Sequence, residues 1–119
     1  MALSIYHNPR CSKSRKTLEL IENNGENVTV IRYLENPPSA ARLLEIAALL
    51  GVAVADLLRT GEATYKSATD LPSLDDDSAL AAWLANHPIV LQRPIVVDDA
   101  KARAVVGRPP ENVTMLLNP

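Results

Sequence analysis

The sequence has few of the residues expected of a nucleic-acid-binding or metal-binding protein. Its 119 residues include one cysteine, two histidines and no phenylalanine, and the formal net charge is −2. One cysteine cannot close an internal disulfide, and with only His7 and His87 beside it there is no ligand set spaced for structural zinc. A slightly acidic chain with few aromatic residues also lacks the basic patch and the stacking groups of a nucleic-acid binder. We therefore expect no metal and no nucleic-acid partner.

Long hydrophobic runs are missing as well. Although 47% of the residues are apolar, no apolar segment approaches the roughly 18 residues that indicate a membrane span. The first residues, MALSIYHNP, lead into a strand-like run without a cationic flank and a long apolar stretch, so we expect no secretory signal, no membrane contact and a cytoplasmic protein. The length predicts one domain covering residues 1–119.

A strand, a helix and a second strand are predicted at the N-terminus. Residues 3–7 are apolar and compatible with a strand, and the apolar spacing from Ser12 to Gly25 indicates a helix. From Val28 to Tyr33, β-branched residues occur at both alternating positions, which predicts a strand buried on both faces. Because a helix joins the two strands, they are expected to be parallel.

Helices are predicted for the middle of the chain. Ser39 is a candidate N-cap for a helix that ends before Gly51. A short third helix is expected to end at residues 59–61, and residues 63–72 to form a surface loop. The acidic run Asp75–Asp77 predicts the start of a fourth helix, where negative charge is favoured by the helix dipole.

Two short β-runs near the C-terminus predict a hairpin. They cover residues 95–97 and 102–106, and a last helix is expected from near Pro109. The resulting order is βαβ, helices, ββ, α. It predicts an α/β protein with a thioredoxin-like mixed sheet and helices on both faces.

The single cysteine lies in the segment IYHNPRCSKSRKTLELI, among polar and cationic residues. If the helix begins just after Cys11, its sulfur lies beside unpaired backbone N–H groups and the positive end of the helix dipole, with Arg15 nearby. These features favour the thiolate over the thiol. His7 could add to this effect if it were protonated, or could simply end the strand, and the spacing leaves both interpretations open.

The spacing around Cys11 excludes two kinds of site. A phosphatase-type loop needs an arginine six residues after the nucleophile, and that position is Thr17. A dithiol site needs a second cysteine at the C-x-x-C position, and that position is Ser14, which can hydrogen-bond a thiolate but cannot close a disulfide. Redox chemistry at Cys11 therefore requires a thiol from outside the chain.

Five segments in matching order together resemble the glutaredoxin-dependent arsenate reductase family: IYHNPRCSKSRKTLELI, RYLENPPS, LLRTGE, HPIVLQRPIVV and GRPPE. The resemblance implies a thioredoxin-like fold in which the cysteine attacks arsenate. It also implies that glutathione forms a mixed adduct at arsenic and that glutaredoxin completes the cycle, releasing arsenite. Glutathione would be a co-substrate, and no tightly bound cofactor is implied.

The resemblance assigns the nucleophile to Cys11 and supporting positions to His7 and Ser14. A tetrahedral oxyanion needs several forked donors, which guanidinium groups supply. Pro94 resembles the cis-proline that thioredoxin-like folds place beside the active cysteine, although most X–Pro bonds are trans. Three arginines match the family's oxyanion-binding positions: Arg59, Arg93 and Arg108.

The sequence allows three other functional interpretations. One is a redox-sensing transcription regulator of the same fold, bound to RNA polymerase; such proteins generally carry C-x-x-C, so Ser14 is unfavourable to it. Another is a glutathione-dependent thiol/disulfide reductase with a different substrate, which the sequence leaves open. The third is an inert loop thiol in a small α/β domain, which the five matching segments make the weaker interpretation.

Overall fold

The computed structural model describes residues 3–117 and divides into two compact units. The first, which we call the sheet unit, comprises the chain up to Asn36 and from Arg93 onward; the second, the helical unit, comprises Pro37–Gln92. Residues 1, 2, 118 and 119 of the expected domain lie outside the described residues, and the single domain stays a prediction. Within residues 3–117, no helix is both long enough and apolar enough to cross a membrane.

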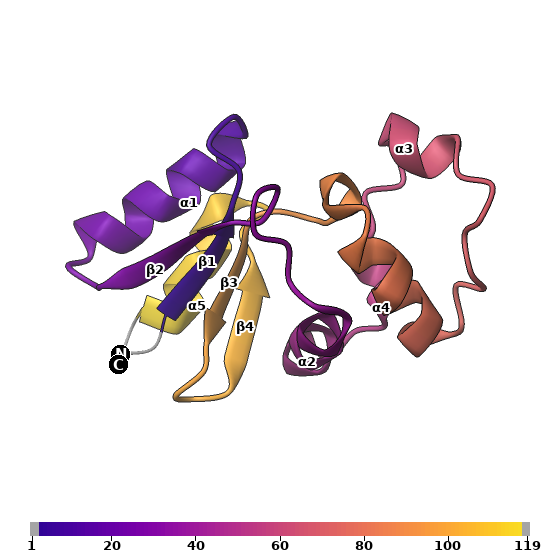
Figure 1. Ribbon diagram of the computed structural model, residues 1–119. Coiled ribbons are helices and arrows are strands. Elements are labelled where there is room, and N and C mark those ends of the chain that lie inside the picture. Colours follow the sequence, from indigo (N-terminus) through magenta and orange to yellow (C-terminus); the bar gives the residue numbers. More distant parts are fainter. Residues whose placement is uncertain (1–2, 118–119) are drawn as a thin grey trace. The chain divides into compact units, whose positions relative to one another are not determined.

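The sheet unit contains a four-stranded mixed sheet with the order β2-β1-β3-β4 (Figure 1). β1 pairs in parallel with β2 and antiparallel with β3, and β3 pairs antiparallel with β4. This arrangement confirms the predicted α/β class, the parallel pair and the hairpin. The strands cover Leu3–His7 (β1), Val28–Arg32 (β2), Ile95–Asp98 (β3) and Arg103–Val106 (β4).

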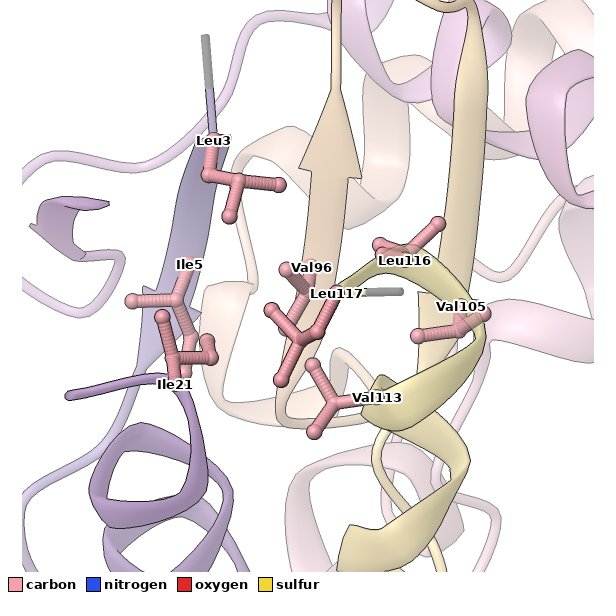
Figure 2. Packing of buried hydrophobic residues seen from close by; sticks show 8 residues of the cluster. All are labelled: Leu3, Ile5, Ile21, Val96, Val105, Val113, Leu116 and Leu117. Carbon is pink, nitrogen blue, oxygen red and sulfur yellow. The ribbon is translucent and has the colours of Figure 1, made fainter. Parts of the chain in front are cut away.

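Helix α1 (Ser12–Asn23) and the C-terminal turns pack on one face of this sheet (Figure 2). Ile5 and Val96 of the central strands and Ile21 of α1 are fully buried there. Burial of each such side chain contributes roughly 1.5–3 kcal/mol relative to exposure. Helices on the second face stay a prediction. The core also contains Leu3, Val105, Val113, Leu116 and Leu117.

Strand β2 differs from its prediction, because it is not buried on both faces. Thr29 is exposed and the side chain of Val30 is 43% exposed. β2 is an edge strand that pairs with β1 alone among the described strands, so its β-branched residues reflect strand preference rather than double burial. The strand also ends at Arg32, and the fully buried Tyr33 follows it.

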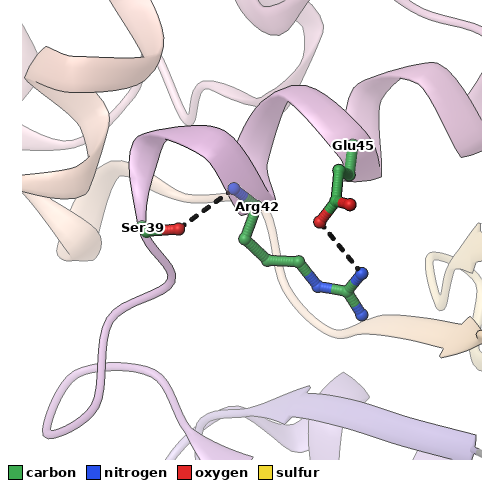
Figure 3. Close-up of polar contacts among 3 residues, drawn as sticks. All are labelled: Ser39, Arg42 and Glu45. Carbon is green, nitrogen blue, oxygen red and sulfur yellow. Dashed lines mark hydrogen bonds and ion pairs between the residues drawn. The ribbon is translucent and has the colours of Figure 1, made fainter.

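In the helical unit, helix α2 (Ala40–Leu50) has the ends predicted from its sequence. The Ser39 hydroxyl accepts a hydrogen bond from the Arg42 N–H at 3.1 Å, which satisfies one of the unpaired donors of the first turn (Figure 3). Gly51 ends the helix with φ 72°, a conformation that favours glycine. On the helix surface, Arg42 forms an ion pair with Glu45 at 3.4 Å (Figure 3).

The acidic run acts as a helix start, as predicted. Helix α4 (Asp77–Ala85) begins after Asp76, whose carboxylate accepts a hydrogen bond from the Ala79 N–H at 3.1 Å. Asp77 also accepts a hydrogen bond from the Val54 N–H at 3.2 Å, which joins α4 to the turn that begins at Val54. Two of the three acidic side chains, Asp76 and Asp77, thus accept hydrogen bonds from backbone N–H groups of the helical unit.

Three predicted segments were wrong in detail. The short third helix is the 3-10 turn η1 (Val54–Leu57), because Leu58 extends to form a β-bridge with Leu91. The expected loop 63–72 begins with the short helix α3 (Ala63–Lys66). The last helix starts as the 3-10 turn η3 and becomes α-helical only over Thr114–Leu117 (α5), since two successive prolines open it. This turn, η3, covers Pro110–Val113, and the other 3-10 turn among residues 3–117 is η2 (Pro88–Val90).

Candidate active site

Cys11 occupies the N-cap of α1, as predicted. Its backbone is extended, with φ −94° and ψ 121°, and its carbonyl accepts the first helical hydrogen bond from the Arg15 N–H at 3.0 Å. The Cys11 N–H donates to the carbonyl of Asn8 at 3.0 Å, so the loop from β1 closes in a tight turn. This turn places the half-buried thiol at the first turn of the helix, where backbone N–H groups lack helical partners.

Several opposing effects set the pKa of the Cys11 thiol. Burial raises the pKa, whereas hydrogen bonds from the Ser14 backbone N–H, the Arg93 side chain and the Lys13 backbone N–H, together with the Arg93 charge, lower it. The net result is a pKa below the ordinary value for cysteine. A thiolate favoured in this way is the nucleophilic form of cysteine.

Ser14 supports the site through its backbone as well as its side chain. Its fully buried hydroxyl accepts a hydrogen bond from the Asn8 N–H at 3.0 Å and lies 2.6 Å from His7 Nδ1. The expected hydrogen bond to the thiolate comes instead from the Ser14 backbone N–H. Ser14 thus joins the end of β1 to the first turn of α1 and fixes the loop that carries Cys11.

The structure favours one of the two interpretations of His7. Burial lowers the pKa of His7, and the positive charges of Arg32 and Arg15 lower it further, against a smaller opposite effect of Glu22. A neutral imidazole is therefore favoured, and it positions Ser14 rather than adding positive charge near Cys11. Arg15 acts on the same loop, because its guanidinium donates to the carbonyl of Pro9 at 2.9 Å.

Arg93 and Arg108 are held together at the start of β3 and the end of β4. Arg108 Nη1 donates to the Arg93 carbonyl at 3.1 Å, and the Gly107 N–H donates to the Pro94 carbonyl at 2.9 Å. The Arg93–Pro94 bond is cis, as the resemblance implies and against the general preference for trans, and the Arg108–Pro109 bond is also cis. Two of the three predicted arginines thus belong to the unit that carries Cys11.

Arg59 lies in the helical unit. Its backbone N–H donates to the Val90 carbonyl at 2.6 Å, and its Nε lies 3.7 Å from a carboxylate oxygen of Glu62. These contacts hold Arg59 within its own unit. Its convergence on the other two arginines stays a prediction.

Two residues with a role near the site were missed in the sequence. Asn8 accepts hydrogen bonds from Arg10 and Cys11 and so shapes the turn before the thiol; its position before a proline was a usable turn signal. Gly107 packs so closely that an added Cβ would lie 2.5 Å from Thr17 Oγ1 and 2.8 Å from Pro94 Cγ. No sequence pattern indicates that contact, because it joins three distant segments.

Comparison with known proteins places this arrangement in a family, since the sequence model of the ArsC family matches residues 6–116. The chain belongs to the ArsC family. An arsenate reductase of Neisseria meningitidis serogroup A is 44% identical to this family member over 117 residues, which cover 97% of each chain. An arsenate reductase of Escherichia coli is 41% identical over 115 residues, covering 97% of this chain and 80% of the relative.

Solved structures agree with the fold of this ArsC family member. An arsenate reductase from Vibrio cholerae is similar with a TM-score of 0.84 and 43% identity, covering 97% of each chain. A structure described as an arsenate reductase of Yersinia pestis gives a TM-score of 0.83 at 43% identity, covering 95% of this chain and 98% of the other. The thioredoxin-like α/β fold predicted from the order of elements is therefore confirmed.

Proposed function

We propose that this protein reduces arsenate to arsenite, with Cys11 as the nucleophile and with glutathione and glutaredoxin as electron donors. The observation that carries the proposal is the Cys11 thiol at the N-terminus of α1, with a lowered pKa and a hydrogen bond from Arg93. The names of the similar proteins support arsenate as the substrate. A cytoplasmic location goes with these donors, because the cytosol keeps glutathione reduced.

The reaction begins with attack of the Cys11 thiolate on the arsenic(V) centre. A sulfur–arsenic bond forms, and one arsenate oxygen leaves as water after protonation. The thiol of glutathione then replaces a second oxygen in the same way. A glutaredoxin thiolate attacks the glutathione sulfur and forms a mixed disulfide with it. The electron pair of the broken bond between the glutathione sulfur and arsenic passes to arsenic, which becomes arsenic(III). Hydrolysis of the remaining bond releases arsenite and returns Cys11.

The arginines would act on charge during the first step. The incoming thiolate and the oxyanion are both negative, so their approach needs positive charge close to both groups. Arg93 contacts the sulfur, and Arg108 is hydrogen-bonded to the Arg93 carbonyl, so we expect both to bind arsenate oxygens with planar guanidinium forks. Arg59 is expected to supply a third fork.

A coupled assay tests this function. Arsenate is supplied with glutathione, glutaredoxin, glutathione reductase and NADPH, and NADPH oxidation is followed in parallel with a panel of small disulfides. We expect arsenate-dependent turnover that Cys11→Ser abolishes, because a hydroxyl is not a nucleophile at neutral pH. Ser12→Ala, which changes the exposed neighbouring residue, should retain turnover.

The outcomes of the assay separate the candidate functions. Arsenate turnover that survives in Cys11→Ser would exclude Cys11 as the nucleophile. Turnover of disulfides without turnover of arsenate would replace the proposal with a thiol/disulfide reductase. No turnover of either substrate by the folded wild-type protein would indicate a function without redox catalysis.

A further inference from the structure

A cavity of about 340 Å³ in the sheet unit is lined by residues at and beyond the carboxyl ends of β1 and β2. The two strands are parallel, and His7 is in register with Arg32, so the residues that follow each strand meet at the same edge of the sheet. One wall is the turn Asn8–Arg10, and the other contains Arg32, Leu34 and Glu35. The volume is at the lower end of the range for small-molecule pockets.

Hydrogen-bonded turns form both walls of the cavity. On one side, the Arg10 N–H donates to Asn8 Oδ1 and the Cys11 N–H to the Asn8 carbonyl, both at 3.0 Å. On the other side, the Glu35 N–H donates to the Arg32 carbonyl at 3.0 Å. The backbone that carries the cavity's charged side chains is therefore ordered without a ligand.

The charges of the cavity are unequal in number. Two guanidinium groups, of Arg10 and Arg32, and one carboxylate, of Glu35, line it. Within residues 3–117, none of these three side chains takes part in an ion pair. Leu34, beside them, is 44% exposed and offers an apolar contact. The cavity thus provides two sites for carboxylates and one for an ammonium group.

The cavity is adjacent to the nucleophile in the chain and in the fold. Arg10 directly precedes Cys11, and the Asn8 carbonyl that accepts the Cys11 N–H belongs to the wall. Cys11 itself does not line the cavity, but a ligand bound there contacts the turn that carries the thiol. This placement suits a second thiol that must reach an atom bonded to Cys11.

We propose that this cavity is the binding site for the thiol tripeptide glutathione, a subsite separate from the arginines that bind the oxyanion. Arg10 and Arg32 hold its two carboxylates, Glu35 holds its single ammonium group, and Leu34 contacts its methylene groups. The match is one of charge number and sign. A small inorganic oxyanion fits less well, because Glu35 would repel it. The inference rests on the proposed function for its biological meaning, but binding can be measured without arsenate.

The test is a titration of the ¹⁵N-labelled protein with S-methylglutathione, whose blocked sulfur cannot react with Cys11. We expect saturable shifts of the amide signals of Asn8, Arg10 and residues 32–35. Arg32→Gln should weaken binding by about tenfold or more, the loss expected for a charge-assisted hydrogen bond. Glu35→Gln should weaken it as well, and the spectrum of each variant shows whether the fold is kept.

Lys101→Gln is the matched control for charge. It removes one positive charge from the same unit, but Lys101 lies in the β3–β4 hairpin, where Asp98 is in register with Leu3 at the opposite end of the sheet. The affinity of the Lys101→Gln variant for S-methylglutathione should equal that of the wild type. Equal losses in Lys101→Gln and Arg32→Gln would overturn the proposal, since binding would then follow net charge alone.

Two further outcomes would also overturn it. One is a set of shifts confined to residues around Arg93 and Arg108, which would place the tripeptide at the oxyanion site. The other is displacement of S-methylglutathione by equimolar sulfate, which would identify an anion site without selectivity for the tripeptide. Binding at the cavity together with failure of the arsenate assay would leave this inference standing and remove the proposed substrate, so the two failures are distinguishable.

Discussion

Replacing Gly107 with alanine should strain the contact that joins α1 to the cis-proline turn. The added Cβ would lie 2.5 Å from Thr17 Oγ1 and 2.8 Å from Pro94 Cγ, well inside the roughly 3.5–4.0 Å of favourable carbon contacts. Neither neighbour can move easily, because Thr17 is fully buried and donates to the Lys13 carbonyl at 2.8 Å, and the proline ring is rigid. The strain must therefore shift the backbone.

Gly61→Ala is the control that isolates this strain. A Cβ at Gly61 meets no atom within 4 Å, so the variant carries only the loss of unfolded-state entropy that any Gly→Ala change brings. Overpacking in a filled interior costs roughly 1–3 kcal/mol. We expect the free energy of unfolding, measured with urea, to be lower in Gly107→Ala than in Gly61→Ala by about that amount.

A double variant locates the strain. Thr17→Ala removes the atom nearest the new Cβ. The double variant Thr17→Ala with Gly107→Ala should therefore lose less free energy of unfolding than the two single variants lose together, by about 0.5–2 kcal/mol. Because the Gly107 N–H donates to the Pro94 carbonyl, the shift should also disturb Arg93 and raise the pH midpoint of Cys11 alkylation. Equal unfolding free energies in the Gly107 and Gly61 variants would refute this reasoning.

Three other predictions concern the thiol, the histidine and the core. Iodoacetamide alkylation of Cys11 should have its pH midpoint below the roughly 8.5 of free cysteine, and Arg93→Lys should move the midpoint upward; a midpoint at the free value in the wild type would contradict the lowered pKa. The pKa of His7 is lowered below about 6.5, so the unfolded chain binds more protons and the free energy of unfolding decreases as the pH falls below that value. In His7→Gln this decrease, measured by urea unfolding at several pH values, should be smaller, and an unchanged pH dependence would contradict the lowered pKa. Ile5→Ala should lower the free energy of unfolding by about 2–5 kcal/mol, and Met115→Ala, at a side chain 67% exposed, by less than about 0.5 kcal/mol; similar losses would contradict the assigned core.

Local sequence signals predicted those parts of the fold that local physics controls. The Ser39 cap and the Gly51 terminus of α2 were found because one hydroxyl and one left-handed residue satisfy the helix ends. The N-cap position of Cys11 was found from the helical apolar spacing that begins at Ser12. In contrast, the β-branched run of β2 could not show whether the strand lies at the centre or the edge of the sheet. That property depends on pairing with distant segments, and the sequence of one strand does not contain it.

The site was predictable in its residue types and less so in their contacts. Among the arginines expected near Cys11, Arg93 lowers the pKa of its thiol, whereas the Arg15 guanidinium donates to the Pro9 carbonyl. Ser14 was expected to hydrogen-bond the thiolate and does so with its backbone N–H. The fold brings Asn8 and His7 onto that hydroxyl instead, through a turn whose shape no single residue specifies. The resemblance supplied Arg93 and Pro94, because nothing in their local sequence separates Arg93 from the chain's other arginines.

The engagement of Ser14 with His7 and Asn8 has a consequence for stoichiometry. The Ser14 hydroxyl is engaged with His7 and Asn8, and Cys11 is the only cysteine in the chain, so the protein cannot supply two electrons by closing an internal disulfide. In the proposed reaction, every turnover would therefore draw both electrons from thiols in solution. Mixed with its substrate and no donor, the protein would stop at a covalent adduct and yield no reduced product. Its rate would follow the supply of reduced thiol as closely as the supply of substrate.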